Sequence, residues 1–563
     1  MTPQSEQPEI DSRMAADQLH PATPQPVRDT SSSEELPLLG DEEQDQVRAS
    51  AARRRQAYVD PDDPIVSPMN LKWIRILHYS VGVLMMVNFI VLLGILISQF
   101  IAIPGFTGRG LSFTLFDLVV ICLVADFLVY WKFTVAGKWE RVGSYICISL
   151  LVIDLVVVLT VGGIRDVYGF LGAALILWTL ATFVFTTICD YKVEQSRKAQ
   201  EIRYTGRVEK RRSIGELLVL FLKAILKLGL VWLVWCLSLT LYLQAFDTHI
   251  KPWGKLIPVH NNEFKVHLAC FGDVHLNKTL VETQYSSSKL QPIVLVEGGQ
   301  LDSSESFQEW IEELYHLKKI QRYCIWDRPG YGFSEGAPSP QSFSIIVEYL
   351  NEALNKEGIE GPFSLVGFDI GGLYSRVFAG RRPGNIHSML LVDSWSEDLL
   401  KTRPFAGLKN ENKKDFRGVL EFMDPLVGIK LWFRGLASPF GILLNIHWFF
   451  HPKKYSSNSR IFGSEMVRQP KYLLARLQEQ TTAAILSYNE VVVSDVKSIP
   501  LSVVSSEYMI KNSINWGKWQ RQLTRLSDQP VEWEIVESAS HFLWKNAKGR
   551  KQLQDVLIRL IEV

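Results

Sequence analysis

The chain has 563 residues, which is more than one typical domain needs. Its 60 Lys and Arg residues balance its 59 Asp and Glu residues to a formal net charge of +1, so charge gives no support to a nucleic-acid partner and none is expected. Hydrophobic residues make up 47% of the chain and are concentrated in its first half, as in an integral membrane protein.

The first 70 residues are rich in Pro, Ser, Gln and acidic residues and nearly lack aromatic ones. Such a composition cannot bury enough apolar area to offset the entropy of ordering, so we expect a disordered tail over residues 1–70. Residues 34–39 (EELPLL) resemble an acidic dileucine sorting signal. Glu34 stands four places before the leucine pair formed by Leu38 and Leu39. The motif indicates sorting machinery as a partner and a vacuolar or lysosomal route, although so short a pattern also arises by chance in an acidic tail.

Five apolar segments follow, each long enough to cross a bilayer as a helix, at residues 76–103, 112–131, 142–163, 168–189 and 216–246. Residues 71–246 therefore predict a multi-pass membrane domain in contact with membrane lipid. The fifth segment contains Lys223 and Lys227. We expect its membrane-embedded part to begin near Leu228, with both lysines extending to the interface.

Positive charge predicts the orientation of these helices. Lysines and arginines are numerous before the first segment, between the second and third, and between the fourth and fifth, whereas the other two loops hold only Arg109 and Arg165. The excess of positive charge on one side places the N-terminus in the cytosol and everything after residue 246 in a lumen or outside the cell. A glycosylation sequon at residues 277–279 agrees with that side.

Three carboxylates, Asp117, Asp126 and Asp154, fall within the predicted spans. Charges at that depth are costly, so they are candidates for a transport function. The alternative is that they face the interior of the bundle and form hydrogen bonds between helices. We favour this alternative because neither a spaced series of partners nor a broken-helix pattern accompanies them.

From residue 247 on, short apolar runs alternate with helical patterns, the runs being residues 263–270, 293–296, 323–326, 363–366, 389–392 and 501–504. This alternation predicts an α/β fold with a mostly parallel sheet, in two parts at 247–395 and 496–563. Residues 396–495 show no clear strands and predict an inserted helical cap. Its aromatic stretch at 431–450 is expected to line an apolar pocket or to touch the bilayer.

Residues 367–372 (GFDIGG) follow the apolar run 363–366. A strand, a sharp turn with one polar residue at its tip and the start of a helix are typical of a nucleophile elbow. The tip here is Asp369, where most elbows have Ser. A carboxylate is already an anion at neutral pH, so Asp369 either attacks a substrate directly or marks the loss of the usual reaction.

Motifs in a fixed order make the chain from about residue 290 resemble the α/β-hydrolase superfamily, namely residues 326–334 (WDRPGYGFS), 365–374 (LVGFDIGGLY), 390–394 (LLVDS) and 538–542 (SASHF). At the tip, Asp369 is similar to the nucleophile of epoxide hydrolases and haloalkane dehalogenases. The whole architecture resembles a family of uncharacterised fungal multispan membrane hydrolases, often labelled mitochondrial. The mitochondrion therefore competes with the vacuole or another endomembrane as the expected location.

The resemblance implies a role for each part of the site. Asp369 would be the nucleophile and His541 the base that activates water. Either Asp393, which we favour, or Glu507 would orient the histidine. Backbone N–H groups of Ile370 and Gly299 would form an oxyanion hole, and the cap tyrosines that could protonate an opened epoxide are Tyr455, Tyr472 and Tyr488.

Two positions depart from the superfamily's pattern. The loop at residues 297–300 reads EGGQ where the superfamily has His-Gly-x-Pro, and Ile370 stands where dehalogenases often have Trp, which disfavours dehalogenation. No CxxC pair occurs, so no metal or cofactor is expected. Cys270 and Cys324 lie in predicted strands and are expected to be buried free thiols.

The sequence thus predicts a membrane-anchored α/β-hydrolase acting on an apolar or lipid-like small molecule of the epoxide or ester type. Two alternatives stay open. One is a catalytically degenerate hydrolase fold used for binding or assembly. The other is a transport or scaffold protein whose function lies in the membrane spans.

Overall fold

The computed structural model describes residues 66–103, 109–131, 136–206, 214–275, 291–301, 303–401, 427–452, 455–513 and 515–562. The predictions made for the tail up to residue 65, including the dileucine-like motif, lie outside these ranges. So do the sequon at 277–279 and residues 402–426 of the predicted cap.

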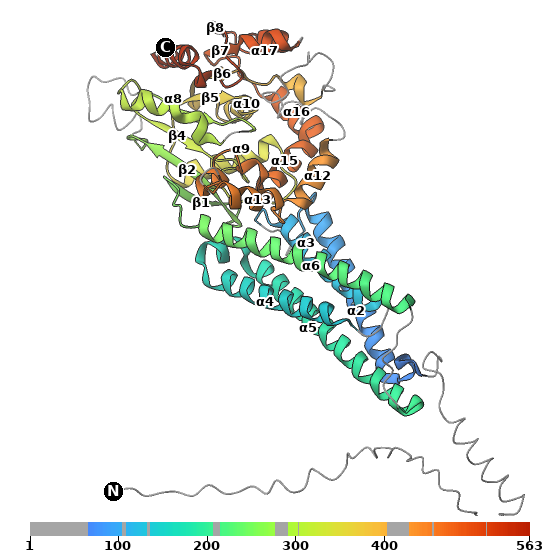
Figure 1. Cartoon of the computed structure of the whole chain (residues 1–563). Helices are drawn as coiled ribbons and strands as arrows, with labels where there is room; N and C mark the ends of the chain where they lie inside the picture. The colour runs from blue at the N-terminus through green and yellow to red at the C-terminus, as the bar shows by residue number, and fades with distance from the viewer. Residues whose placement is uncertain are drawn as a thin grey trace, which may run out of the picture. The chain divides into compact units, whose positions relative to one another are not determined.

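Five long helices follow the short helix η2 (Pro68–Asn70), and they are α2 (Lys72–Ser98), α3 (Ser112–Tyr130), α4 (Lys138–Thr160), α5 (Gly162–Thr205) and α6 (Ile214–Asp247) (Figure 1). Within the described residues, all five are long and apolar enough to cross a membrane, judged by length and composition. They coincide with the five predicted segments, except that α5 continues well beyond residue 189 into the basic stretch that follows.

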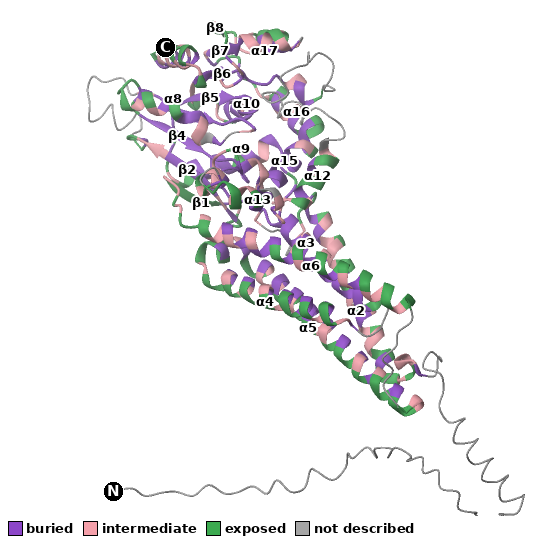
Figure 2. Ribbon diagram, in the orientation of Figure 1, coloured by how far each residue is buried: buried purple, intermediate pink, exposed green. Residues whose placement is uncertain are grey.

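The outer surface of these helices is apolar. Figure 2 shows exposed residues along α2 and α6, and they include large apolar side chains such as Ile76 (67% exposed) and Leu228 (69% exposed). Exposed apolar side chains that no described residue covers match the hydrocarbon of a bilayer rather than water.

Lys223 and Lys227 do not extend to an exposed interface as expected but are buried among the helices. A Cβ on Gly143 of α4 would lie 3.1 Å from Lys227 Cγ, and the Lys227 ammonium lies 5.1 Å from the centre of the Phe183 ring of α5. The prediction of extended lysines was wrong because acidic residues on neighbouring helices, Glu140 and Asp190, offer them counter-charges inside the bundle.

Two carboxylates within the helices form hydrogen bonds to polar side chains of other helices. Asn88 Nδ2 of α2 donates to Asp126 Oδ2 of α3 at 2.7 Å, and Ser238 Oγ of α6 donates to Asp154 Oδ2 of α4 at 2.7 Å. Asp117 is buried as well. The interior-facing interpretation is confirmed for Asp126 and Asp154, each of which links one helix to another.

The C-terminal half is built on one eight-stranded sheet in the order β1-β2-β4-β3-β5-β6-β7-β8. The strands are β1 (Lys255–Val259), β2 (Phe264–Phe271), β3 (Ile293–Glu297), β4 (Tyr323–Trp326), β5 (Phe363–Phe368), β6 (Ile386–Val392), β7 (Leu501–Ser506) and β8 (Val531–Val536). β1 and β2 are antiparallel to their neighbours, and the strands from β4 to β8 run parallel. The mostly parallel sheet is confirmed, and the edge strands β1 and β8 are additional to the predicted ones.

Helices cover both faces of this sheet, so its central strands are buried throughout (Figure 2). One face packs against α8 (Ser304–His316) and α19 (Ala547–Glu562), which bury large side chains such as Trp310 and Leu557. The other face packs against α9 (Phe343–Lys356), α10 (Gly371–Arg381) and α18 (Trp516–Leu523). This three-layer arrangement leaves the carboxyl ends of the parallel strands to carry the functional loops.

Cys270 and Cys324 form a disulfide bond, which contradicts the expectation of two free thiols. The antiparallel pairing of β2 with β4 sets the two cysteines directly opposite each other, with their Cα atoms 4.1 Å apart. β2 and β4 pair although β3 lies between them in the chain. The sequence alone therefore could not predict that the two cysteines are partners. The cysteines of the membrane helices, Cys122, Cys147, Cys189 and Cys236, are free and buried.

Between the short helix η4 (Glu397–Leu400) and β7, the described residues contain helices and no strand, as predicted for the cap. They are α12 (Val427–Ala437), α13 (Ile442–Phe450), α14 (Ser457–Ile461), η5 (Met466–Arg468), α15 (Pro470–Thr482), η6 (Ala483–Ser487) and α16 (Tyr488–Val493). The aromatic stretch lies against the ends of the membrane helices, since Trp432 Nε1 donates to Gln99 Oε1 at 2.7 Å and Gly435 packs on Phe113.

Candidate active site

The nucleophile elbow has the geometry that its sequence predicts. Asp369 connects β5 to α10 with a φ of 56°, a left-handed conformation that is strained for a residue with a side chain. Gly367 and Gly372 allow the strand and helix to approach, because a Cβ on Gly367 would lie 2.6 Å from Gly372 Cα. The Asp369 carbonyl accepts hydrogen bonds from the Trp395 N–H at 3.0 Å and from Ser394 Oγ at 3.0 Å, so the following strand end holds the turn.

Three predicted site residues meet at the carboxyl ends of the strands. His541 Nε2 lies 3.2 Å from Asp369 Oδ1, and His541 Nδ1 lies 2.6 Å from Asp393 Oδ2. All three residues are at least 95% buried. The structure therefore brings together a carboxylate at the elbow, an imidazole and a second carboxylate, which is the arrangement of a nucleophile, a base and an orienting acid.

Of the two candidates for the orienting acid, the structure places Asp393 at the histidine. Its other oxygen, Oδ1, accepts from Trp516 Nε1 at 2.8 Å and from the Ser506 N–H at 3.1 Å, so the carboxylate is fixed on both sides. Glu507 is partly exposed and instead pairs with Lys511 and accepts from the Ser538 N–H. Glu507 therefore takes no part in the site.

The two carboxylates control the charge of the histidine. Burial lowers the pKa of His541, but the hydrogen bonds and negative charges of Asp369 and Asp393 outweigh it and raise this pKa to about 10. The imidazole is therefore protonated at neutral pH. Removing the charge of either acid would lower the pKa of His541 and free its proton.

The oxyanion loop, residues 297–300, supplies a hydrogen bond to the carboxylate, but not from the predicted residue. The donor is the Gln300 N–H, 2.9 Å from Asp369 Oδ2, whereas Gly299 packs beside Asp369 with room for no side chain. Proline has no N–H, so the departure from the superfamily's His-Gly-x-Pro pattern provides a donor that proline could not. Ile370 follows Asp369 directly, and its contribution to the oxyanion hole stays a prediction.

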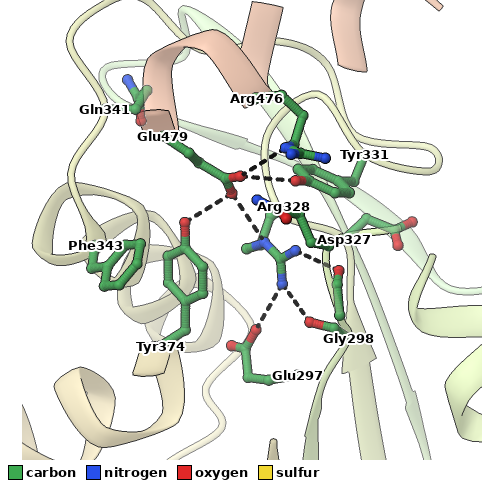
Figure 3. A network of polar contacts seen from close by, with 12 residues as sticks. Glu297, Gly298, Asp327, Arg328, Tyr331, Gln341, Phe343, Tyr374, Arg476 and Glu479 are labelled. Carbon is green, nitrogen blue, oxygen red and sulfur yellow. Dashed lines mark hydrogen bonds and ion pairs between the residues drawn. The ribbon is translucent and has the colours of Figure 1, made fainter. Parts of the chain in front are cut away.

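A buried arginine holds the oxyanion loop from behind (Figure 3). Arg328 Nη1 and Nη2 donate to the carbonyls of Gly298 and Gly299 at 2.6 and 2.7 Å. Its Nε lies 3.6 Å from Oε1 of Glu479, a residue of the cap helix α15. The loop's position is thus coupled to the cap through one guanidinium group.

Glu479 is the centre of this polar network. Besides Arg328, it accepts hydrogen bonds from the hydroxyls of Tyr331 and Tyr374, both at 2.9 Å, and lies near Arg476. On the other side of Arg328 stands Glu297, where burial raises the carboxyl pKa to about 7 against the opposing effects of Arg328 and Trp326. The sequence analysis included Glu297, Tyr331 and Tyr374 only as members of motifs and missed Glu479 and Arg476, because the partners in this network are far apart in the chain.

Of the three predicted cap tyrosines, only Tyr472 reaches the oxyanion loop. Its hydroxyl donates to the Gln300 carbonyl at 2.7 Å and accepts from Arg476 Nη1 at 2.9 Å. Tyr455 stacks on His447 and packs near α6, and Tyr488 packs against the main core with Lys401 over its ring. Tyr455 and Tyr488 make these contacts elsewhere in the cap, and their role as proton donors stays a prediction.

The order and direction of the strands are those of the α/β-hydrolase fold, and a family model agrees. Residues 291–424 match the family described as alpha/beta hydrolase fold. Among solved structures, an alpha/beta hydrolase enzyme from a deep-sea metagenome library of the Medee basin is 16% identical, covering 55% of this chain and 95% of that one with a TM-score of 0.35. The enol-lactonase from Burkholderia xenovorans is 12% identical, covering 55% and 100% with a TM-score of 0.37. Likeness at this level says nothing about the reaction.

Similarity over most of the chain is found with yeast membrane proteins. An uncharacterised vacuolar membrane protein of Saccharomyces cerevisiae is 30% identical over 87% of both chains, and an uncharacterised protein of Schizosaccharomyces pombe is 28% identical over 85% of this chain and 88% of its own. Residues 34–270 also match a family described as a region of unknown function. The chain belongs to the family of this Saccharomyces cerevisiae vacuolar membrane protein. In this chain, an N-terminal region of apolar helices is joined to a domain with the α/β-hydrolase fold.

Proposed function

We propose that the C-terminal domain hydrolyses an apolar substrate in two steps, through an ester formed on Asp369. The observation that carries the proposal is the position of Asp369 between two partners, with Oδ1 facing His541 and Oδ2 bound by the Gln300 N–H. A structural carboxylate at an elbow needs neither partner. A carboxylate that is to attack, and later to be released by water, needs both.

In the first step, Asp369 Oδ1 attacks a saturated carbon of the substrate. A new C–O bond forms as the bond to the leaving group breaks, and the leaving group keeps the bonding electron pair. An epoxide suits this step because its leaving oxygen stays attached to the product. The side-chain amide of Gln300 is buried without a hydrogen-bond partner among the described residues, so it is free to bind that oxygen.

In the second step, His541 acts as the base. Esterification removes the negative charge of Asp369, which lowers the pKa of His541, and Nε2 gives its proton to the alkoxide oxygen of the opened epoxide. The neutral imidazole then takes a proton from water, and the water oxygen attacks Cγ of the ester. Negative charge develops on Oδ2, where the Gln300 N–H already points. The alcohol leaves and Asp369 carries one oxygen from water.

The surroundings support a lipid-like substrate and a vacuolar membrane location. Exposed aromatic side chains on α13, Phe449 (73% exposed) and Phe450 (68% exposed), lie in a cap whose neighbouring helix contacts the ends of the membrane helices. The yeast relative is a vacuolar membrane protein. The positive charge of the loops favours a cytosolic N-terminus and a lumenal hydrolase domain, and a disulfide in that domain suits an oxidising lumen.

Intact-mass spectrometry of the full-length protein in detergent tests the reaction. His541→Gln is incubated with alkyl epoxides of increasing chain length and with long-chain esters, and Asp369→Asn is the matched control. We expect a stable adduct in His541→Gln that maps to Asp369 and is missing from Asp369→Asn. In the wild type, turnover in water labelled with ¹⁸O should place the label in the Asp369 carboxylate.

The outcomes separate the proposal from its alternatives. An adduct that forms equally in Asp369→Asn assigns the nucleophile to another residue and overturns the mechanism. Absence of an adduct and of label across the whole panel overturns the proposal in favour of a binding or assembly domain, or of a function carried by the membrane helices.

A further inference from the structure

A second cluster of buried titratable side chains lies outside the site described above. It consists of His267 on β2, Glu305 in the first turn of α8 and Asp327 directly after β4. One ligand atom from each residue lies within 4.8 Å of the others. His267 Nδ1 is 2.8 Å from Asp327 Oδ2 and 3.9 Å from Glu305 Oε1, so one ring nitrogen faces two carboxylates.

The other ring nitrogen fixes the orientation of the imidazole. His267 Nε2 lies 2.6 Å from the Trp253 carbonyl oxygen, and because a carbonyl can only accept, Nε2 carries a hydrogen. A histidine that binds a metal ion commonly donates its second N–H to a backbone carbonyl in this way, which leaves the first nitrogen free as a ligand. His267 is fully buried and therefore held in this position by packing.

Three of the four carboxylate oxygens of the cluster lack a donor, whereas Asp327 Oδ2 accepts from the Phe333 N–H at 3.1 Å and lies beside His267 Nδ1. Both oxygens of Glu305 and Oδ1 of Asp327 are buried without a hydrogen-bond partner among the described residues. The nearest buried ammonium, Lys471, donates instead to the carbonyls of Gly332 and Ser334 at 2.5 and 3.0 Å. Buried carboxylates that face each other with so few donors require positive charge between them.

We propose that His267, Glu305 and Asp327 bind Zn²⁺, and that they bind it more tightly than Mn²⁺ or Mg²⁺. One imidazole nitrogen and two carboxylate oxygens are ligands that Zn²⁺ accepts, and the order of affinities among these metals places Zn²⁺ above Mn²⁺. A neutral imidazole and two carboxylates balance the double positive charge, so the buried cluster becomes neutral. A water molecule would complete a tetrahedral site.

The ion needs only a small opening of the cluster. Metal–ligand distances of about 2.0–2.1 Å in a tetrahedron separate two ligand atoms by about 3.3 Å, against 2.8 Å between His267 Nδ1 and Asp327 Oδ2. The ion would join β2, the loop after β4 and α8. Asp327 precedes Arg328, which holds the oxyanion loop, and α8 follows that loop, so the site would stiffen the support of the active site.

Metal content by mass spectrometry of the tag-free, full-length protein tests this inference. The protein is stripped with EDTA, incubated with Zn²⁺ and desalted, and the titration is repeated with Mn²⁺ and Mg²⁺. We expect about one retained Zn²⁺ per chain, with Mn²⁺ weaker and Mg²⁺ not retained, and a higher melting temperature in Zn²⁺ than in EDTA.

Glu305→Gln is the diagnostic variant because it removes one ligand charge and keeps the side chain's shape. It should weaken Zn²⁺ binding at least about tenfold and abolish the rise in melting temperature. Glu335→Gln, a change at another buried acid that accepts from the Lys265 N–H, is the control and should bind like the wild type. His267→Gln provides a second test at a different ligand.

Three results would overturn the inference. The wild type could retain no Zn²⁺, which would mean that two protons, on His267 and Glu305, balance the cluster. Glu305→Gln and His267→Gln could both bind as the wild type does, which would place the ion at another site. Mg²⁺ could bind as tightly as Zn²⁺, which would contradict the role of the imidazole.

Discussion

The membrane helices and the hydrolase domain both bury aspartates, but they pair them with different partners. In the helices, Asp126 and Asp154 accept hydrogen bonds from an amide and a hydroxyl, which carry no charge. In the hydrolase domain, Asp369 and Asp393 flank His541, whose pKa they raise to about 10.

This difference separates structural acids from reactive ones. A neutral partner stabilises a carboxylic acid or a carboxylate alike, and its main effect is to tie two helices together. A titratable partner makes the charge of each group depend on the other, so any reaction that neutralises Asp369 changes the protonation of His541. The comparison therefore favours the hydrolase domain, rather than the helices, as the place where chemistry occurs.

The largest effect is expected from Asp393→Asn. An asparagine can still accept from Trp516, but its amide cannot orient the imidazole as a carboxylate does, so turnover should fall by about 10³–10⁴-fold while the ester on Asp369 accumulates. Glu507→Gln is the control and should leave turnover unchanged, because Glu507 pairs with Lys511 and not with His541. Turnover is measured on the substrate that the adduct identifies, and equal losses in both variants would contradict the assignment of the acid.

A second effect concerns pH. The pKa of His541 is raised in the folded protein, so its ion pairs stabilise the fold fully below about pH 6.5, the pKa of an unfolded histidine, and this contribution is lost as pH rises through about 10. A shift of this size corresponds to on the order of 4 kcal/mol. The difference in melting temperature between the wild type and His541→Gln should therefore shrink from pH 6 to pH 10. A difference that stays constant would show that His541 is neutral in the folded protein.

Glu479→Gln should lower the stability of the fold almost as strongly as the loss of the His541 ion pairs, because Glu479 is the centre of the network behind the oxyanion loop. Removing its charge leaves Arg328 and Arg476 buried without this partner. Breaking a buried ion pair in this way typically lowers the free energy of unfolding by about 3–5 kcal/mol. Glu352→Gln breaks a partly exposed pair with Lys356 and should cost about 0–1 kcal/mol. Melting temperatures of both variants check this, and similar losses would mean that the network contributes no more than a surface pair.

The sequence predicted those parts of the molecule that depend on local pattern. The apolar segments, the elbow around Asp369 and the order of the motifs that include His541 each occupy one continuous stretch, and all were predicted. The choice of Asp393 over Glu507 could not be made, because both follow a strand and only the packing of Trp516 decides which carboxylate meets the imidazole. Chain order alone favoured Asp393 only slightly over Glu507.

Contacts between distant segments were the parts that the sequence could not show. The disulfide depends on the pairing of β2 with β4, and the predicted donor Gly299 missed Gln300 by one residue because loop geometry decides which N–H points at the carboxylate. The cluster of His267, Glu305 and Asp327 was missed altogether. Its members come from three separate elements with no metal-binding spacing, so only the fold brings them together.

The smallest effect is expected in the membrane helices. Asp126→Asn keeps a side chain that can form a hydrogen bond with Asn88, whose own oxygen accepts from Trp178 Nε1 at 2.8 Å, so the link between α2, α3 and α5 should persist. Such hydrogen bonds contribute about 0.6 kcal/mol on average between membrane helices. We therefore expect a small change in melting temperature and an unchanged rate of ester formation on Asp369. A loss of function in Asp126→Asn with normal ester formation would contradict this expectation. It would show that the charge of Asp126 matters for function, a role that its uncharged partners do not suggest, and would place function in the helices.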